Sequence, residues 1–416
     1  MPAEPSGPNK HPSYTQLRGE AAVTEVAEEI VEGAEHELEL ADMTVFGAGC
    51  GPLELASEAA ARSEVSKVYE SSGPTEQNRL NRRPNRSGAF ASVKHERKYR
   101  LTIAALLVAA VAVTVLILTW GNNFEIFGDK WWRVARMYGS AVVVIAVVTF
   151  AQSFATVTFQ TVTNNRIITP SIMGFDSLFV LIQTSIVYLF GTTGVLAVSP
   201  GLRFALQVTL MVAFAVGLYS WLLSGRLGSL HVMLLVGIVI GTGLGAISTF
   251  MQRMLDPNEF DVLRARLFAN IGNAETGLLV YVVPICVVVG GIIWVLGRRL
   301  NVLSLGAETS TNLGLNHKRQ VMLMLTLVAI LSAMSTSLIG PMTFLGFLCA
   351  TLAYSLVDTY DHRRILPVAW LLGYVILGGA YFLLRHVFTM VDAVTVIVEL
   401  IGGLAFLIVI MKRGRL

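Results

Sequence analysis

The chain has 416 residues, of which 54% are hydrophobic and only 14% are charged, and its mean hydropathy is +0.64. Soluble domains carry about 25% charged residues, so this composition excludes an ordinary soluble protein. Apolar runs of about 17 to 25 residues, long enough to cross a bilayer as a helix, recur from Leu101 to the end. No alternation of period two accompanies them, which argues against an outer-membrane barrel. We predict an all-α, polytopic membrane protein.

Charge divides the chain into two predicted domains. Residues 1–93 hold 15 acids and 8 bases, whereas residues 94–416 hold 13 acids and 23 bases. The first segment has no membrane-length apolar run and is rich in Glu, Ser, Gly, Pro and Arg, a composition typical of disorder. Its start also lacks the basic region and apolar core of a signal peptide. We expect a disordered acidic cytoplasmic tail at 1–93 and a transmembrane domain at 94–416.

Basic residues near the predicted spans indicate the orientation of the chain. With the N-terminus inside, 15 Lys and Arg fall in cytoplasmic segments and 8 in outer loops, as the positive-inside rule requires. Both termini are therefore expected in the cytoplasm, in a protein of the cell membrane. About ten spans are predicted, near residues 101–120, 138–161, 171–190, 202–222, 229–250, 277–297, 320–339, 342–358, 365–384 and 393–411.

Two early spans carry unusual residues. In "TPSIMGFDSL", Asp176 stands at the head of a span, where it needs protein or water for company, or else caps the helix. In "GIVIGTGLGAISTF", Gly237, Gly241 and Gly245 share one helical face. That face allows close helix packing, or it forms a narrow wall beside a translocation path. Both interpretations remain open from the sequence.

A polar island, "NVLSLGAETSTNLGLNHKRQ", separates two apolar runs at 301–320. Its glycines permit tight turns, and Ser304 or Thr309 is expected to cap a short helix. Taken alone, the island is a solvated loop. Further on, Gly340-Pro341 interrupts an apolar stretch, so one helix should end there and another begin. Such a break at membrane depth must be buried or line a cavity.

Several kinds of site are missing. No GxxxxGK[ST], HExxH or GxSxG motif occurs, the histidines are scattered, and the three cysteines form no CxxC pair. We therefore expect no metal, no cofactor, no catalytic residue and no ATP site in this chain. Asp176 and Glu399 are the main ionisable residues away from span ends, which disfavours a proton-driven carrier.

Four segments in the correct order carry a family resemblance: "FQTVTNNRIITPSIMGFDSLFVLIQT", "LSLGAETSTNLGL", "GPMTFLGFLCATLA" and "DHRRILP". From about Lys94 onward the chain resembles the permease subunits of ABC importers for ferric siderophores, haem and vitamin B12. The resemblance implies a ten-span fold, ABC ATPase subunits that bind ATP, an extracytoplasmic substrate-binding protein, and a second permease in a homodimer or heterodimer. The "NNRIITPSIMGFDSL" form is most similar to ferric-siderophore permeases. No nucleic acid partner is expected.

The expected function is translocation of a ferric siderophore into the cytoplasm, driven by ATP hydrolysis in the partner. Haem or vitamin B12 as cargo, a secondary carrier without an ATPase, and a scaffold or sensor without transport remain alternatives. No residue need ligate iron, because the siderophore fills its coordination.

The resemblance also implies three sets of site residues. ATPase coupling through two short helices falls on Leu303, Ser304, Leu305, Gly306, Glu308, Thr309, Leu313, Gly314 and Leu315. Docking of the binding protein falls on Arg385, followed by Asp392, and on Arg133 and Arg136, whose spacing fits although the usual proline is absent. Snorkelling to lipid headgroups is the alternative for these arginines. The translocation path falls on Phe175, Asp176, Gly237, Gly241 and Gly245.

Overall fold

The computed structural model describes residues 90, 93–120, 129–224, 230–267, 271, 275–386 and 394–413. The predicted tail at 1–93 lies almost wholly outside the described residues, as does Asp392. All regular elements in these described ranges are helical and belong to one unit, Ser87–Leu416. The predicted all-α class is confirmed.

The membrane helices follow the predicted spans closely. Seven are long and apolar enough to cross a bilayer, and three shorter apolar stretches, Phe175–Gly191, Leu345–Leu356 and Val396–Ile408, coincide with the other predicted spans. The helices are α4 (Val93–Thr119), α5 (Asp129–Val162), α6 (Phe175–Ala197), α7 (Pro200–Ser224), α8 (Leu230–Gln252), α10 (Leu279–Val295), α13 (His317–Ile339), α14 (Leu345–Leu356), α15 (His362–His386) and α16 (Val394–Arg413).

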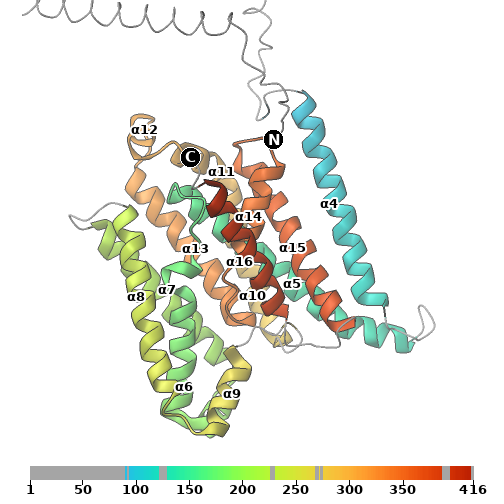
Figure 1. Ribbon diagram of the computed structural model, residues 1–416, viewed down its shortest axis with the longest axis vertical. Coiled ribbons are helices and arrows are strands. Elements are labelled where there is room, and N and C mark those ends of the chain that lie inside the picture. The colour runs from blue at the N-terminus through green and yellow to red at the C-terminus, as the bar shows by residue number, and fades with distance from the viewer. Residues whose placement is uncertain are drawn as a thin grey trace, which may run out of the picture. The chain divides into compact units, whose positions relative to one another are not determined.

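Helices α5 and α13 form the centre of the bundle (Figure 1). Both are mostly buried, and α5 contacts α13, α14 and α15. Small polar side chains such as Thr149 and Ser153 on α5 are fully buried because their hydroxyl groups donate to backbone carbonyls. Close helix contact through small residues is the usual packing mode where lipid removes the hydrophobic drive for association.

The glycine face of α8 packs against the segment that leads into α6. A short 3-10 turn, η1 (Ser171–Met173), ends at Gly174, whose φ of 94° favours glycine. A Cβ at Gly241 would lie 2.7 Å from the Gly174 Cα, and a Cβ at Gly237 would lie 3.0 Å from the Met173 side chain. Of the two interpretations of these glycines, close packing is therefore the one that the structure displays.

The helix break at Gly340 divides two elements of unequal length. Helix α13 ends at Ile339, Gly340 has φ of 99°, and α14 begins at Leu345. With about 1.5 Å of rise per residue, the 12 residues of α14 cover about 18 Å, less than the roughly 30 Å of a bilayer core. If α14 belongs to a segment that crosses the bilayer, residues 340–344 are expected at membrane depth, where they need protein contacts.

One such contact involves the acid at the head of α6. The hydroxyl of Thr343 donates to Oδ2 of Asp176 at 3.0 Å. The N-cap residue of α6 is Gly174, with no side-chain cap. The capping alternative for Asp176 is thus wrong. This carboxylate instead accepts a hydrogen bond from another polar side chain within the bundle.

Candidate functional site

The polar island between α10 and α13 contains two short helices, α11 (Gly297–Leu303) and α12 (Ala307–Asn312). Gly306 and Gly314 follow them with φ of 94° and 83°. A Cβ at either position would meet only open space, so the left-handed backbone, and not crowding, is what favours glycine. The two turns direct α12 away from the bundle, at the opposite end from α9 (Pro257–Leu267) (Figure 1).

Exposed leucines mark the tip of this pair of helices. Leu305 is 56% exposed and Leu313 is 61% exposed, while Glu308 and Thr309 also face solvent. Leu303, by contrast, is 1% exposed and packs into the core. The predicted coupling side chains are thus exposed on α12 and its turns, half-buried at Ser304 and Leu315, and buried as an anchor at Leu303.

The expected hydroxyl caps are not formed. Ser304 lies at the end of α11, where its hydroxyl donates to the Asn301 carbonyl at 2.8 Å, and Thr309 lies inside α12. Gly306 is the N-cap residue of α12 and offers no side chain. The hydroxyl that holds this turn is instead Ser310, which is buried and lies 2.7 Å from Nδ1 of His317.

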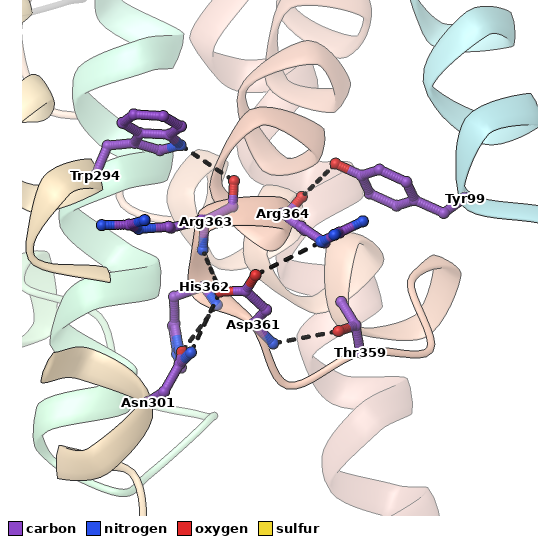
Figure 2. Close-up of polar contacts among 8 residues, drawn as sticks. All are labelled: Tyr99, Trp294, Asn301, Thr359, Asp361, His362, Arg363 and Arg364. Carbon is purple, nitrogen blue, oxygen red and sulfur yellow. Dashed lines mark hydrogen bonds and ion pairs between the residues drawn. The ribbon is translucent and has the colours of Figure 1, made fainter. Parts of the chain in front are cut away.

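Asn301 joins α11 to the start of α15 (Figure 2). Its Oδ1 accepts the backbone N–H of His362 at 3.0 Å and lies 2.6 Å from Nδ1 of the same residue. A backbone N–H can only donate, which fixes the amide orientation, and Nδ1 must therefore carry the hydrogen in its contact with this oxygen. On the other side of the ring, Nε2 of His362 lies 2.7 Å from the hydroxyl of Thr161 on α5. His362 is 5% exposed, so one buried imidazole connects three helices.

Further contacts hold the first turn of α15 in place. Asp361 accepts from the Asn301 amide at 3.2 Å and from the backbone N–H of Arg363 at 3.2 Å. Trp294 donates to the Arg363 carbonyl at 3.2 Å (Figure 2). The Arg363 guanidinium donates to the Val295 carbonyl at 2.7 Å. Because α10, α11 and α15 are linked by these bonds, we call Asn301, Asp361, His362 and Arg363 the anchor cluster.

A cavity of about 620 Å³ opens beside the anchor cluster. It lies between the end of α5, the end of α11 and the loop before α15, and its lining includes Arg166, Leu305, Asp358 and His362. The hydrogen bond and ion pair with Lys98, at 2.8 Å, hold the pKa of Asp358 below its usual value. The exposed tip, the anchor cluster and the cavity therefore share one end of the helical body.

The predicted path residues are mostly packed within the chain. Phe175 is buried, and the backbone at Gly237 and Gly241 faces η1, so these three residues lie against the chain's own core. Asp176 and Gly245 are half-buried.

Arg385 is held at the far end of α15. Its guanidinium donates to the Tyr381 hydroxyl at 2.6 Å and lies over the ring of Tyr138, 4.6 Å from its centroid. Arg133 and Arg136 belong to the first turns of α5, and their side chains lie outside the described residues. Since Tyr138 follows them on α5, the backbone brings the three arginines to the same end of the bundle. In the described part of the chain, no group of three or more His, Cys, Asp or Glu could hold a metal ion.

Residues 101–412 match the FecCD transport family. The chain belongs to the FecCD transport family. It is 42% identical over 330 residues to the petrobactin import system permease protein FatC of Bacillus anthracis, covering 79% of this chain and 93% of FatC. It is 39% identical over 265 residues to the petrobactin import system permease protein YclO of Bacillus subtilis, covering 64% and 84%.

A second petrobactin import system permease protein of Bacillus anthracis, FatD, is 22% identical and covers 64% of this chain and 77% of FatD. A solved metal-chelate type ABC transporter in an inward-facing conformation has a TM-score of 0.65 and 19% identity, covering 76% of this chain and 99% of that one. The last match shows the fold alone. This FecCD chain is a multi-pass permease subunit of an iron-siderophore ABC importer, and it is not the ATPase.

Proposed function

We propose that this FecCD permease carries a ferric siderophore of the petrobactin type inward, together with a second permease. The assignment of the cargo rests on the 42% identity to FatC over 93% of that protein's length. Identity to the differently named petrobactin permease FatD is only 22%. A heterodimer, in which this chain takes the FatC-like position, fits that difference better than a homodimer.

The ATPase partner, in this proposal, holds the exposed tip formed by α12 and its two glycine turns. Leu305 and Leu313 supply apolar side chains that fit a groove, and Glu308 lies in the first turn of α12, where an acid is favourable. The anchor cluster links this tip to α10 and α15 through hydrogen bonds. A displacement of the tip by the ATPase thereby reaches the membrane helices as a rigid-body movement.

The orientation follows from the same assignment. The tip and both termini face the cytoplasm, and α9 with the ends of α5 and α15 faces outward, where the binding protein docks. Tyr381 and Tyr138 fix the position of the Arg385 guanidinium, so it can meet an acidic side chain with little loss of conformational freedom. Arg133 and Arg136 serve the same docking surface. Asp176 and Gly245, both half-buried, are the predicted residues best placed beside the cargo path.

The coupling role can be tested by replacing Gly306 and Gly314 together with leucine. Side chains strain the left-handed backbone at both turns, so the variant should insert and assemble but hydrolyse ATP without importing cargo. Gly291→Leu is the matched control, because Gly291 is exposed on α10, a Cβ there also meets open space and its φ lies outside the left-handed region. Uptake of ferric petrobactin at the wild-type rate by the double variant would contradict the coupling role.

The cargo is tested separately in a strain that lacks this chain. Uptake of ferric petrobactin should be lost, while uptake of haem and vitamin B12 should continue. Transport by vesicles without any ATPase subunit would instead indicate a secondary carrier.

A further inference from the structure

A second cavity, of about 400 Å³, lies at the opposite end of the body from α12. Its walls come from α6, α7, α9, the end of α13 and the 3-10 turn η2 (Thr276–Leu278). Ligand pockets in proteins range from about 300 to 1,000 Å³, so this space suits one small chemical group. Its polar and charged lining residues are Gln183, Arg203, Gln207, Arg266, Glu275 and Ser337.

Two buried glutamines present unsatisfied groups here. Gln183 is 8% exposed and Gln207 is 2% exposed, and Nε2 of Gln183 donates to Oε1 of Gln207 at 2.7 Å. The remaining Oε1 of Gln183 and Nε2 of Gln207 have no hydrogen-bond partner among the described residues. Exchanging O and N in both amides would preserve the pair and still leave one donor and one acceptor. Leaving a buried polar group unpaired is unfavourable, so a ligand with complementary groups is stabilised here by hydrogen bonds to both amides.

The charged residues of the cavity add a preference for an anion. Arg203 forms an ion pair with Glu275 at 2.9 Å, and Arg266 has no ion pair with a described residue. Burial, followed by the proximity of Arg203, lowers the pKa of Arg266. Two guanidinium groups against one carboxylate leave a surplus of one positive charge, which a monoanion neutralises. The planar guanidinium fork matches the two oxygens of a carboxylate.

We propose that this cavity binds a carboxylate that carries a neighbouring hydrogen-bond donor. Arg266 forms an ion pair with the carboxylate. Nε2 of Gln207 donates to the remaining acceptor of the ligand, and Oε1 of Gln183 accepts from its donor. Two sources fit this chemistry: an acidic residue of the docked binding protein, with its own backbone N–H as donor, or the cargo. Both sources of the carboxylate depend on the proposed transport function, whereas the binding of a carboxylate in this cavity does not depend on it.

The binding step is tested on the full chain in lipid nanodiscs, with sodium lactate, sodium acetate and sodium chloride titrated at constant ionic strength. Thermal unfolding should shift upward with lactate, which has a hydroxyl beside its carboxylate, more than with acetate, and least with chloride. Arg266→Gln should weaken the apparent affinity for lactate at least tenfold. Arg264→Gln is the matched control, because Arg264 lies on the same helix but does not line the cavity.

The double variant Gln183→Met with Gln207→Met provides a second test, because it removes both amides at similar volume and leaves no buried amide of this pair without its partner. It should fold stably and lose the advantage of lactate over acetate. Equal shifts with lactate and chloride in the wild-type chain, or equal behaviour of the Arg266 and Arg264 variants, would overturn the proposal and leave a water-filled cavity.

The source is distinguished by measuring how the binding protein, with and without cargo, docks on the complete transporter. Equal weakening of both forms by Arg266→Gln would indicate a carboxylate of the binding protein, and weakening of the loaded form alone would indicate the cargo. Unchanged docking of both forms would overturn a role in transport. The lactate titration tests the cavity even if the chain carries another cargo. Failure of the carboxylate site and failure of the proposed function can therefore be told apart.

Discussion

Removing the Asn301 side chain should weaken the mechanical link between the exposed tip and the membrane helices. Asn301→Ala leaves the backbone N–H and the Nδ1–H of His362 without their acceptor, in a residue that is only 5% exposed. Each buried donor left unsatisfied costs about 1–3 kcal/mol. Asn301 itself is half-buried, so water can partly replace it, and we expect a total loss of about 2 kcal/mol. If these roughly 2 kcal/mol are lost from the free energy that links α11 to α15, the coupling constant between the tip and the membrane helices falls by about 30-fold.

The assay is the complete transporter in proteoliposomes, with cargo uptake and ATP hydrolysis measured on the same preparation. Asn301→Ala should retain hydrolysis and lose most of the cargo moved per ATP. Ser355→Ala is the control, because Ser355 is exposed on α14, donates to the Leu352 carbonyl of its own helix, and belongs neither to the tip nor to the anchor cluster. Wild-type uptake per ATP in both variants would refute the reasoning that the anchor cluster transmits movement.

Three other predictions follow from contacts in the bundle. Gly241→Ala places a Cβ 2.7 Å from a neighbouring backbone and should destabilise the chain by about 1–3 kcal/mol, whereas Gly243→Ala, which meets open space on the same helix, should be neutral or stabilising in unfolding assays. Arg385→Gln should slow association with the binding protein, most strongly at low salt; rates that are equal to wild type in stopped flow at low salt would contradict docking there. The lowered pKa of Asp358 means that its ion pair with Lys98 stabilises the fold above the ordinary carboxyl pKa of about 4 and is lost as pH falls through the lowered value. Unfolding midpoints of wild type and Asp358→Asn should therefore differ at pH 7 and converge only once the pH has fallen below the lowered pKa of Asp358.

The membrane helices were predictable because their signal is local. A run of apolar residues specifies a span by composition alone, and Gly340-Pro341 indicates a break because glycine permits the left-handed backbone at a helix end and the proline that follows it has no N–H to donate. Helix α9 was missed because its residues are polar and it is too short to span a membrane. The cap of α12 was mispredicted because Ser304 is the C-cap residue of α11, which leaves Gly306 at the N-cap of α12.

The anchor cluster could not be derived from the sequence. Asn301 and His362 are 61 residues apart, and Thr161 is 201 residues from His362. Nothing in the pattern "DHRRILP" shows which polar partner it meets, although its polar residues at the head of a span were a visible signal. The same applies to Gln183 and Gln207, which look like isolated polar residues within two different spans until the fold pairs them.

The meeting of Gly174 and Gly241 has a mechanical consequence. Where two backbones touch with no side chains between them, there is nothing that can change rotamer to absorb a displacement. Rotation of either segment would bring a flanking side chain into a gap that has no room for it, so this contact opposes rotation. Helices α6 and α8, joined by this contact, should travel as one block during the transport cycle, and the seams that open and close must lie elsewhere in the bundle.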